Sequence, residues 1–426
     1  MSRRLLRNLA SRHPIVDRIR IGVRSRLQER EAARSQARCE REVARRNLAV
    51  PQGAALRTAL RNRLGSRPHP PWPKQKGDLH VFLPIWVYNW EIVLPETLAP
   101  FGRVTHFDWG KAGFDALSPD WVSQRDAMNE AMLEAFDTAH REQPVDLVVG
   151  CLSGGNTAPE TLERMARRGC AIVNFCFDDK LHFHGIELGG RPSGPAPLAS
   201  QVDLNLTNAP SSLVKYAAHG GLALFWPQGA HPGLHRPVET PFEFDVSFVG
   251  GGFGWRPVLI GRLQRLLAPA GVEVACFGPR WPAGPLSDEE LVRLYSRSRI
   301  NLGFGGVASS RRLTCLKGRD FEVPMSGGLY LTQHNPELEQ VFDVGREIVT
   351  YRDEADCARI IRELLGDPER AAAIRRAARA RCLRDHTWEQ RWAQVFALAG
   401  ILAPEPDRSE ASEVGDSGGS QAEGPV

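Results

Sequence analysis

Residues 244–281, FDVSFVGGGFGWRPVLIGRLQRLLAPAGVEVACFGPRW, decide the fold that the sequence predicts. An apolar segment typical of a β-strand (244–249) ends in a run of glycines, and another such segment follows at 272–277. Glycine turns of this kind lead from a strand into a helix in α/β proteins. The alternation continues through three more strand-like segments, at 299–304, 329–332 and 347–350. Because such alternation forms a parallel sheet covered on both faces, we expect a doubly wound domain over 236–402.

A second series of the same kind lies upstream, with a helical pattern at 119–140. Its strand-like segments are 79–83, 145–150, 171–176, 202–206 and 222–225. The chain has 426 residues, more than the roughly 250–300 at which one hydrophobic core stops growing. We therefore expect two tandem Rossmann-like α/β domains facing a cleft, the first over 77–235. Capping boxes predict three helix starts: Thr157 with Glu160, Ser287 with Glu290, and Thr387 with Gln390.

Both ends of the chain differ from this pattern. Residues 1–76 form an extension and linker whose first 70 residues hold eighteen Arg, no Lys and five acids. From Pro14 an amphipathic helix is predicted, with Val16, Ile19, Val23 and Leu27 at helical spacing. Two interpretations stay open: residues 1–50 lie on an anionic membrane surface, or they are a solvated extension. No aromatic residue occurs before Trp72, which disfavours nucleic acid, and the acidic segment 403–426 is predicted to be disordered.

Net charge, cysteine spacing and apolar runs indicate the cellular compartment of the protein and its need for a metal or cofactor. The net charge of +4 is too small to indicate a polyanion partner for the whole chain. Eight cysteines are scattered without a C-x-x-C motif, which is typical of a reducing cytoplasm. The sequence contains no run of about 18 apolar residues, the length that would predict a membrane span. We therefore expect a cytoplasmic protein, which would lie on the inner face of the plasma membrane if it contacts lipid. No H-E-x-x-H motif is present, and we expect neither a metal ion nor a cofactor.

Three places in the second domain predict a nucleotide site, because ligands of parallel sheets bind beyond the carboxyl ends of the strands. The first is the glycine loop after 244–249 with its following cation: Gly250, Gly251, Gly252 and Arg256. The second is Trp281, which could lie beside a base. The third holds Lys317, Arg319 and Glu322 with the turn of Ser326, Gly327 and Gly328. Two cations suit a diphosphate, and a carboxylate suits the paired hydroxyls of a ribose, so the combination favours a nucleotide-sugar.

The first domain offers candidates for a general base in the segment FDDKLHFH (177–184). These are Asp178, Asp179, His182 and His184, since carboxylates and imidazoles can take a proton at neutral pH. For any single one of them, a polar loop with helix-capping aspartates is the favoured explanation. Asn156 and His334 are further candidates for residues in the cleft.

The stretch KGRDFEVPMSGGLYLTQHNPELEQVFDVGREIVTY (317–351) closely resembles the C-terminal domain of the CgeB-like, spore-maturation-protein-like glycosyltransferases. Upstream, WPQGAHP, DVSFVGG and GPRWPAGPLSDEELVRLYSRSRINLGF occur in the order of the same family. The resemblance implies the GT-B fold, with the donor held mainly by the second domain and the acceptor by the first. It implies that Glu322 holds the donor ribose, that the turn 326–328 presents amides to phosphate, and that Lys317 and Arg319 neutralise the leaving diphosphate.

The resemblance departs at one position, because retaining GT-B enzymes carry a second Glu eight residues earlier, where this chain has Thr314. The stereochemistry and the sugar therefore stay open. We expect transfer of a sugar from a nucleoside diphosphate, UDP- or GDP-linked, to a glycan, lipid-linked or protein acceptor in cell-surface polysaccharide or glycoconjugate synthesis. Two alternatives remain: a nucleotide-sugar epimerase on the same fold, and a non-catalytic scaffold.

Overall fold

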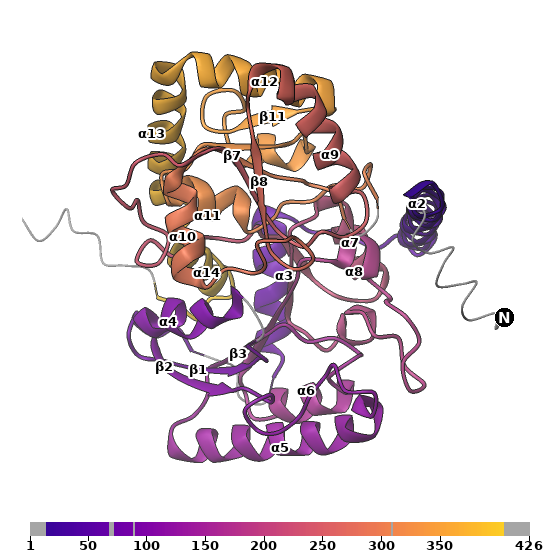
Figure 1. Cartoon of the computed structure of the whole chain (residues 1–426). Coiled ribbons are helices and arrows are strands. Elements are labelled where there is room, and N and C mark those ends of the chain that lie inside the picture. The colour runs from indigo at the N-terminus through magenta and orange to yellow at the C-terminus, as the bar shows by residue number, and fades with distance from the viewer. Residues whose placement is uncertain (1–13, 68–71, 88–89, 308–309, 404–426) are drawn as a thin grey trace, which may run out of the picture.

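Two parallel β-sheets carry the fold and form the cores of two domains, one above the other in Figure 1. The computed structural model describes residues 14–67, 72–87, 90–307 and 310–403. Both sheets are parallel throughout, and helices cover both faces of each. The prediction of two doubly wound domains is confirmed. The predicted disordered tail lies outside the described residues from 404 onward, as does the start of the Arg-rich extension up to residue 13.

The first sheet has the order β2-β1-β3-β4-β5-β6. Its strands are β1 (Leu79–Pro84), β2 (Gly102–Phe107), β3 (Leu147–Gly150), β4 (Ala171–Cys176), β5 (Leu204–Thr207) and β6 (Ala223–Phe225). The helices of this domain are α3 (Gly53–Gly65), η1 (Trp90–Val93), α4 (Leu94–Leu98), η2 (Ala99–Phe101), α5 (Trp121–Glu142), α6 (Pro159–Ala166), α7 (Asp179–His182), η3 (Ala196–Leu198), η4 (Pro210–Ser212) and α8 (Leu213–Ala218). Sequence analysis did not predict β2, an edge strand that is partly exposed along its length and carries Arg, Thr and His.

The second sheet has the order β11-β10-β9-β7-β8. Its strands are β7 (Phe244–Val249), β8 (Val274–Phe277), β9 (Ser298–Leu302), β10 (Tyr330–Gln333) and β11 (Val349–Tyr351). The helices that follow β7 are α9 (Arg256–Leu267), η5 (Ala268–Ala270), α10 (Asp288–Arg297), α11 (Arg319–Met325), η6 (Pro336–Gln340), α12 (Glu354–Gly366), α13 (Pro368–Asp385) and α14 (Trp388–Leu398). In both sheets the first strand lies between the second and the third, so the strand order reverses there, and ligands of such sheets bind at that reversal.

The predicted helix starts are confirmed at two of the three capping boxes. Ser287 with Glu290 begins α10, and Thr387 with Gln390 begins α14. The prediction at Thr157 was wrong, because Ala158 is the N-cap of α6 and the Thr157 hydroxyl donates to the Asn156 side chain instead.

The last helix, α14, packs into the core of the first domain although the chain reaches it from the second (Figure 1). Trp392 on α14 packs against Trp226, with ring centroids 4.7 Å apart, and donates from its indole to Thr97 on α4. Helix α3 also contributes to this core through three buried leucines. The expected domain 236–402 thus includes a helix that packs in the first domain, and the expected extension 1–76 includes a helix of the same core.

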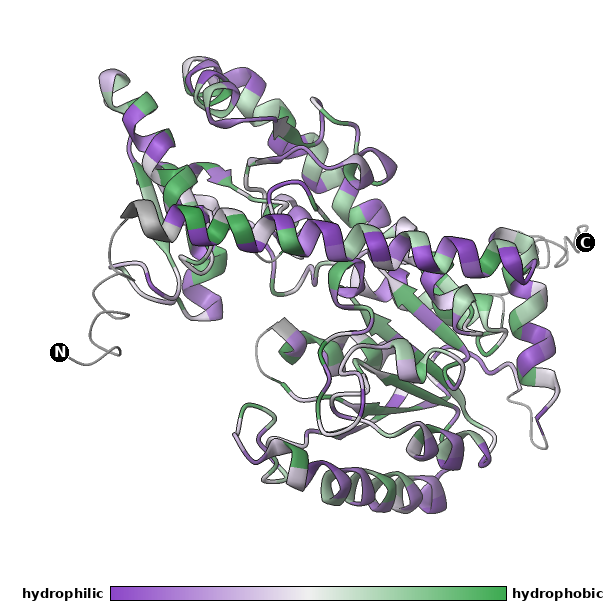
Figure 2. Ribbon diagram, turned by 90° about the vertical axis from the view of Figure 1, so that its right-hand side faces the viewer, coloured by the Kyte–Doolittle hydropathy of each residue, from purple (hydrophilic) through white to green (hydrophobic). Residues whose placement is uncertain are grey.

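Helix α2 (Pro14–Arg45) runs across one face of the molecule and contacts both domains (Figure 2). Near its start, a Cβ on Gly22 would lie 3.8 Å from the Trp255 ring of the second domain. Glu29 accepts a hydrogen bond of 2.7 Å from Ser310 of the same domain. Further along, α2 packs against α7 and α8 of the first domain. The predicted long helix is confirmed, and it spans the junction of the two domains.

Candidate active site

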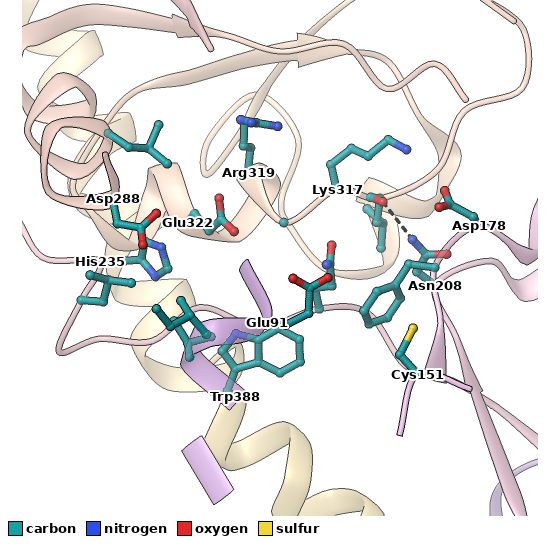
Figure 3. A pocket seen from close by; sticks show the side chains of 18 of the residues that line it. Glu91, Cys151, Asp178, Asn208, His235, Asp288, Lys317, Arg319, Glu322 and Trp388 are labelled. Atoms are coloured by element: carbon teal, nitrogen blue, oxygen red, sulfur yellow. Dashed lines mark hydrogen bonds between the residues drawn. The ribbon is translucent and has the colours of Figure 1, made fainter. Parts of the chain in front are cut away.

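A cavity of about 350 Å³ lies between the two domains, beyond the carboxyl ends of their strands (Figure 3). This size fits the usual 300–1,000 Å³ range of small-molecule sites. Its polar and charged lining residues are Glu91, Asp178, Asn208, Gln228, His235, Asp288, Lys317, Arg319 and Glu322. In Figure 3, Lys317, Arg319 and Glu322 lie on one wall, and Glu91 and Trp388 lie on the wall opposite. The cavity therefore combines two cations with several carboxylates.

The wall from the second domain is built by the segment that enters α11. The buried Asp320 accepts a hydrogen bond of 2.7 Å from the backbone N–H of Lys317, which fixes the loop before the helix. Burial raises the pKa of Asp320 to about 7. A Cβ at Gly318 would lie 2.6 Å from Glu322 Oε1, so glycine leaves the space that this carboxylate occupies.

Arg319 is one of the two cations on this wall. Burial opposes its charge, but Tyr295 and Glu322 raise the pKa of its guanidinium above the ordinary value. Within the described part of the chain its buried Nε has no hydrogen-bond partner, so one donor is left for a ligand. Lys317 donates from Nζ to Cys315 Sγ at 3.0 Å. A fixed guanidinium beside a carboxylate can hold an anionic group and a hydroxylated group side by side.

The glycine loop after β7 forms a cluster behind this wall. Trp281 donates from its indole to the Gly250 carbonyl at 2.7 Å, and Arg256 donates to the Gly251 carbonyl at 3.2 Å. A Cβ on Gly252 would lie 3.2 Å from the Trp281 ring. Burial, and then the charge of Arg319, lowers the pKa of Arg256. The structure thus brings the first two predicted places together, although this cluster does not line the cavity itself.

The turn of Ser326, Gly327 and Gly328 lies at the other end of α11. Ser326 is fully buried and donates to the Glu322 carbonyl, and a Cβ on Gly327 would lie 3.2 Å from Pro237. Helix α11 has seven residues and is therefore about 10 Å long, which separates the turn from Lys317 and Arg319. The expectation that this turn presents amides to a phosphate in the cleft is corrected: the turn connects α11 to β10.

Only one of the predicted bases of the first domain lines the cavity, and it is Asp178. Asp179 is fully buried and accepts hydrogen bonds from Thr207, Ser212 and Tyr216 at 2.8–2.9 Å. Burial raises the pKa of Asp179 to about 6, but its oxygens are occupied, so it anchors α7 and cannot reach a substrate.

The remaining predicted residues of the cleft also lie elsewhere. His182 is exposed outside the cavity, and His184 lies 2.8 Å from the Arg38 guanidinium on α2. Asn156 accepts from the Ser153 backbone within its own turn. His334 lines a different hollow beside α12. The structure therefore corrects these four expectations.

Sequence analysis missed several residues that line the cavity, among them Gln228, His235 and Trp388. The first two belong to the segment that crosses between the domains, and Trp388 starts α14. His235 Nδ1 accepts a hydrogen bond of 3.1 Å from the His231 backbone, which leaves Nε2 to carry the proton of the neutral ring. Burial lowers the pKa of His235. No local motif signals these residues, because their place depends on how the two domains meet.

Two side chains of the first domain, Asn208 and Lys180, make hydrogen bonds to the second domain. Asn208 donates to the Leu316 carbonyl at 2.9 Å (Figure 3). Lys180 on α7 reaches Glu337 at 2.7 Å and the Thr314 carbonyl at 2.6 Å. Thr314 itself is buried, eight residues before Glu322. The base of the cleft is thus held by polar contacts from both sides.

In the described ranges, no group of three or more His, Cys, Asp or Glu side chains is placed to hold a metal ion. Among the helices described, none has the length and apolar character that crossing a bilayer requires.

Comparison with known proteins agrees with the fold. Residues 256–397, about a third of the chain, match the family described as "Glycosyl transferase-like". No curated protein sequence matches the chain. Sucrose-phosphate synthase from Thermosynechococcus elongatus is structurally similar, with a TM-score of 0.53 and 14% identity over 75% of this chain and 98% of that one. HepE of Anabaena, solved with UDP, has a TM-score of 0.50 and 15% identity over 75% and 99%. The fold is GT-B.

Proposed function

We propose that this chain, a glycosyltransferase by the family of its second domain and by its GT-B fold, moves a sugar from a nucleoside diphosphate to an acceptor bound by the first domain. The observation that carries the proposal is the joint position of Lys317, Arg319 and Glu322 in the cavity between the domains. The acceptor is a glycan, a lipid-linked saccharide or a protein in the synthesis of cell-surface polysaccharide or glycoconjugates.

The donor lies against the second domain in this proposal. Arg319, with Arg256 behind it and Lys317 beside it, offsets the charge of the diphosphate, and Glu322 accepts the ribose hydroxyls. The side chains supply this positive charge, so we propose a reaction without a metal ion or cofactor, and a chelator should leave the rate unchanged. UDP is the first nucleotide to test, since the similar HepE was solved with it, and GDP is the second.

The acceptor is proposed to occupy a hollow of about 370 Å³ at the ends of β1 and β2, which shares Ile92 with the cavity. An indole face and polar groups, from Trp86, His106 and Asp108, line this hollow and suit a sugar ring. A Cβ on Gly110 would lie 2.3 Å from the Trp86 indole, so only glycine lets the ring lie there. Trp86→Ala should slow transfer and leave donor binding unchanged.

The transfer breaks the bond between the anomeric carbon and the diphosphate and forms a bond from that carbon to an acceptor hydroxyl. The diphosphate leaves with the electron pair, and its negative charge grows next to Arg319 and Lys317, where fixed cations stabilise the transition state more than the ground state. The acceptor hydroxyl loses its proton. Asp178 lines the cavity from the first domain and is the group that we assign to accept that proton.

The experiment is product analysis after incubation with UDP-sugars and GDP-sugars, with and without a glycan extract as acceptor. Transfer predicts that free nucleoside diphosphate appears, that the extract increases its rate of release, and that Arg319→Ala abolishes the increase. An epimerase would change the sugar and leave the diphosphate bond intact. No release and no altered sugar from any donor would contradict the proposal in favour of a scaffold.

We place the reaction in the cytoplasm, which supplies a reducing environment. All eight cysteines lie in the described ranges and have free thiols, and five of them are buried. Free buried thiols fit a compartment in which disulfides do not form.

A further inference from the structure

Helix α2 exposes an apolar and basic face although its other face is packed. At about 100° per residue, Ile19, Val23 and Leu27 fall on one side of the helix. These side chains are 62%, 52% and 59% exposed, which is unusual for three aliphatic residues in one row. The opposite side holds Ser25 and Ala32, which are buried. The exposed aliphatic row therefore has no part in the packing of α2 on the protein.

Arginines surround this row. The exposed arginines on and beside it are Arg20, Arg24, Arg26, Arg30 and Arg34, and Glu31 lies at its edge. We call these arginines with Ile19, Val23 and Leu27 the outer face of α2. At helical spacing Arg26 falls on one side of the row and Arg20 and Arg24 fall on the other, while Arg30 and Arg34 continue the row toward the C-terminus of the helix. Such a face matches a bilayer of anionic lipids, because the aliphatic groups enter the acyl boundary while the guanidinium groups stay among the phosphates.

The inner side of α2 fixes the outer face on the body of the protein. Glu29 is bonded to Ser310 of the second domain, and Arg38 lies against His184 of the first. The helix is therefore ordered before any partner binds, and docking does not have to include the cost of folding it.

We propose that the outer face of α2 docks the enzyme on an anionic lipid bilayer. This inference goes beyond sugar transfer and does not depend on it. A nucleic acid is the less suitable partner, because the outer face offers aliphatic groups and no aromatic ring for stacking on bases. An anionic bilayer would contact both the arginines and the aliphatic row.

The test measures co-sedimentation of the full-length chain with vesicles of phosphatidylcholine alone and of phosphatidylcholine with phosphatidylglycerol in equal parts. Binding is expected with the anionic vesicles only and should weaken at high salt. Each arginine near the surface contributes about fivefold in affinity, so Arg20→Gln/Arg24→Gln/Arg26→Gln should weaken binding about 100-fold. Ile19→Ser/Val23→Ser/Leu27→Ser should also weaken it, by about tenfold or more for each side chain that is fully buried in the bilayer.

The matched control is Arg167→Gln/Arg293→Gln/Arg346→Gln, which removes the same charge from exposed arginines on other elements. It should bind anionic vesicles nearly as the natural chain does, and all variants should keep their melting temperature and their donor binding. Equal loss in the control and in the α2 variant would overturn the proposal, because net charge alone would then explain binding. Retention on polyuridylate without binding to either vesicle would overturn it in favour of nucleic acid.

Discussion

Replacing Glu322 with alanine should selectively weaken the binding of a nucleotide relative to that of a bare diphosphate. In the proposed function, the carboxylate accepts ribose hydroxyls while Arg319 and Lys317 hold the phosphates. A hydrogen bond to a charged group is worth about 1.5–3 kcal/mol, so its loss corresponds to roughly 10- to 100-fold in the dissociation constant of UDP. Pyrophosphate has no ribose and should bind the variant at least as well, because Glu322 no longer offsets the charge of Arg319.

Isothermal titration calorimetry with UDP and with pyrophosphate measures both quantities on the same protein. Glu273→Ala is the control, since it removes a carboxylate that is exposed at the start of the segment leading into β8. Wild-type affinity for UDP in a folded Glu322→Ala protein would refute the ribose role. An equal loss of UDP and pyrophosphate would show that the carboxylate acts through the phosphate site instead.

Three further predictions follow from individual contacts. Gly318→Ala places a Cβ where the Glu322 carboxylate now lies. It should weaken UDP binding about tenfold or more in calorimetry, which corresponds to the loss of one hydrogen bond to a charged group. Gly366→Ala is the control and should leave UDP binding unchanged, because nothing lies near its Cβ. The pKa of Asp320 in the folded protein is about 7, above its ordinary value, so the contribution of Asp320 to stability is full below about pH 4 and is lost as the pH rises to 7. In urea unfolding, Asp320→Asn should therefore gain stability relative to the natural chain as the pH rises from about 5 to about 8. A difference in stability that does not change with pH would contradict this. Lys180→Gln leaves the buried Glu337 without its cation and should lower the free energy of unfolding by about 3–5 kcal/mol. The double variant with Glu337→Gln should recover part of this loss. If the losses of the two single variants add up in the double variant, the two side chains do not stabilise each other.

The strands of the second domain were predictable because each carries apolar residues in a short segment between turn signals. β2 was not, since an edge strand that is half exposed keeps polar residues and shows no such segment. The start of α14 was predicted by its capping box, but the core that receives it was not. A cap is a local interaction, whereas the packing of Trp392 depends on the position of the whole second domain.

The same distinction applies to the site. Lys317, Arg319 and Glu322 are close in the sequence, so their common position could be predicted from one motif, and the structure places all three in the cavity. The turn at 326–328 follows in the same motif, but α11 places it one helix length away from Lys317 and Arg319. Residues such as His235 come from the crossing segment and reach the cavity only through the arrangement of the domains, which no local pattern encodes.

The central claim is that the second domain binds a nucleoside diphosphate through Arg319. Thermal unfolding of the natural chain and of Arg319→Ala with UDP, GDP and their sugars tests it most directly, because a ligand at 100 times its dissociation constant adds about 2.7 kcal/mol of stability. The account predicts that one nucleoside diphosphate and its sugars stabilise the natural chain, and that this stabilisation is lost in Arg319→Ala. Equal stabilisation of both proteins, or none with any nucleotide, would contradict it.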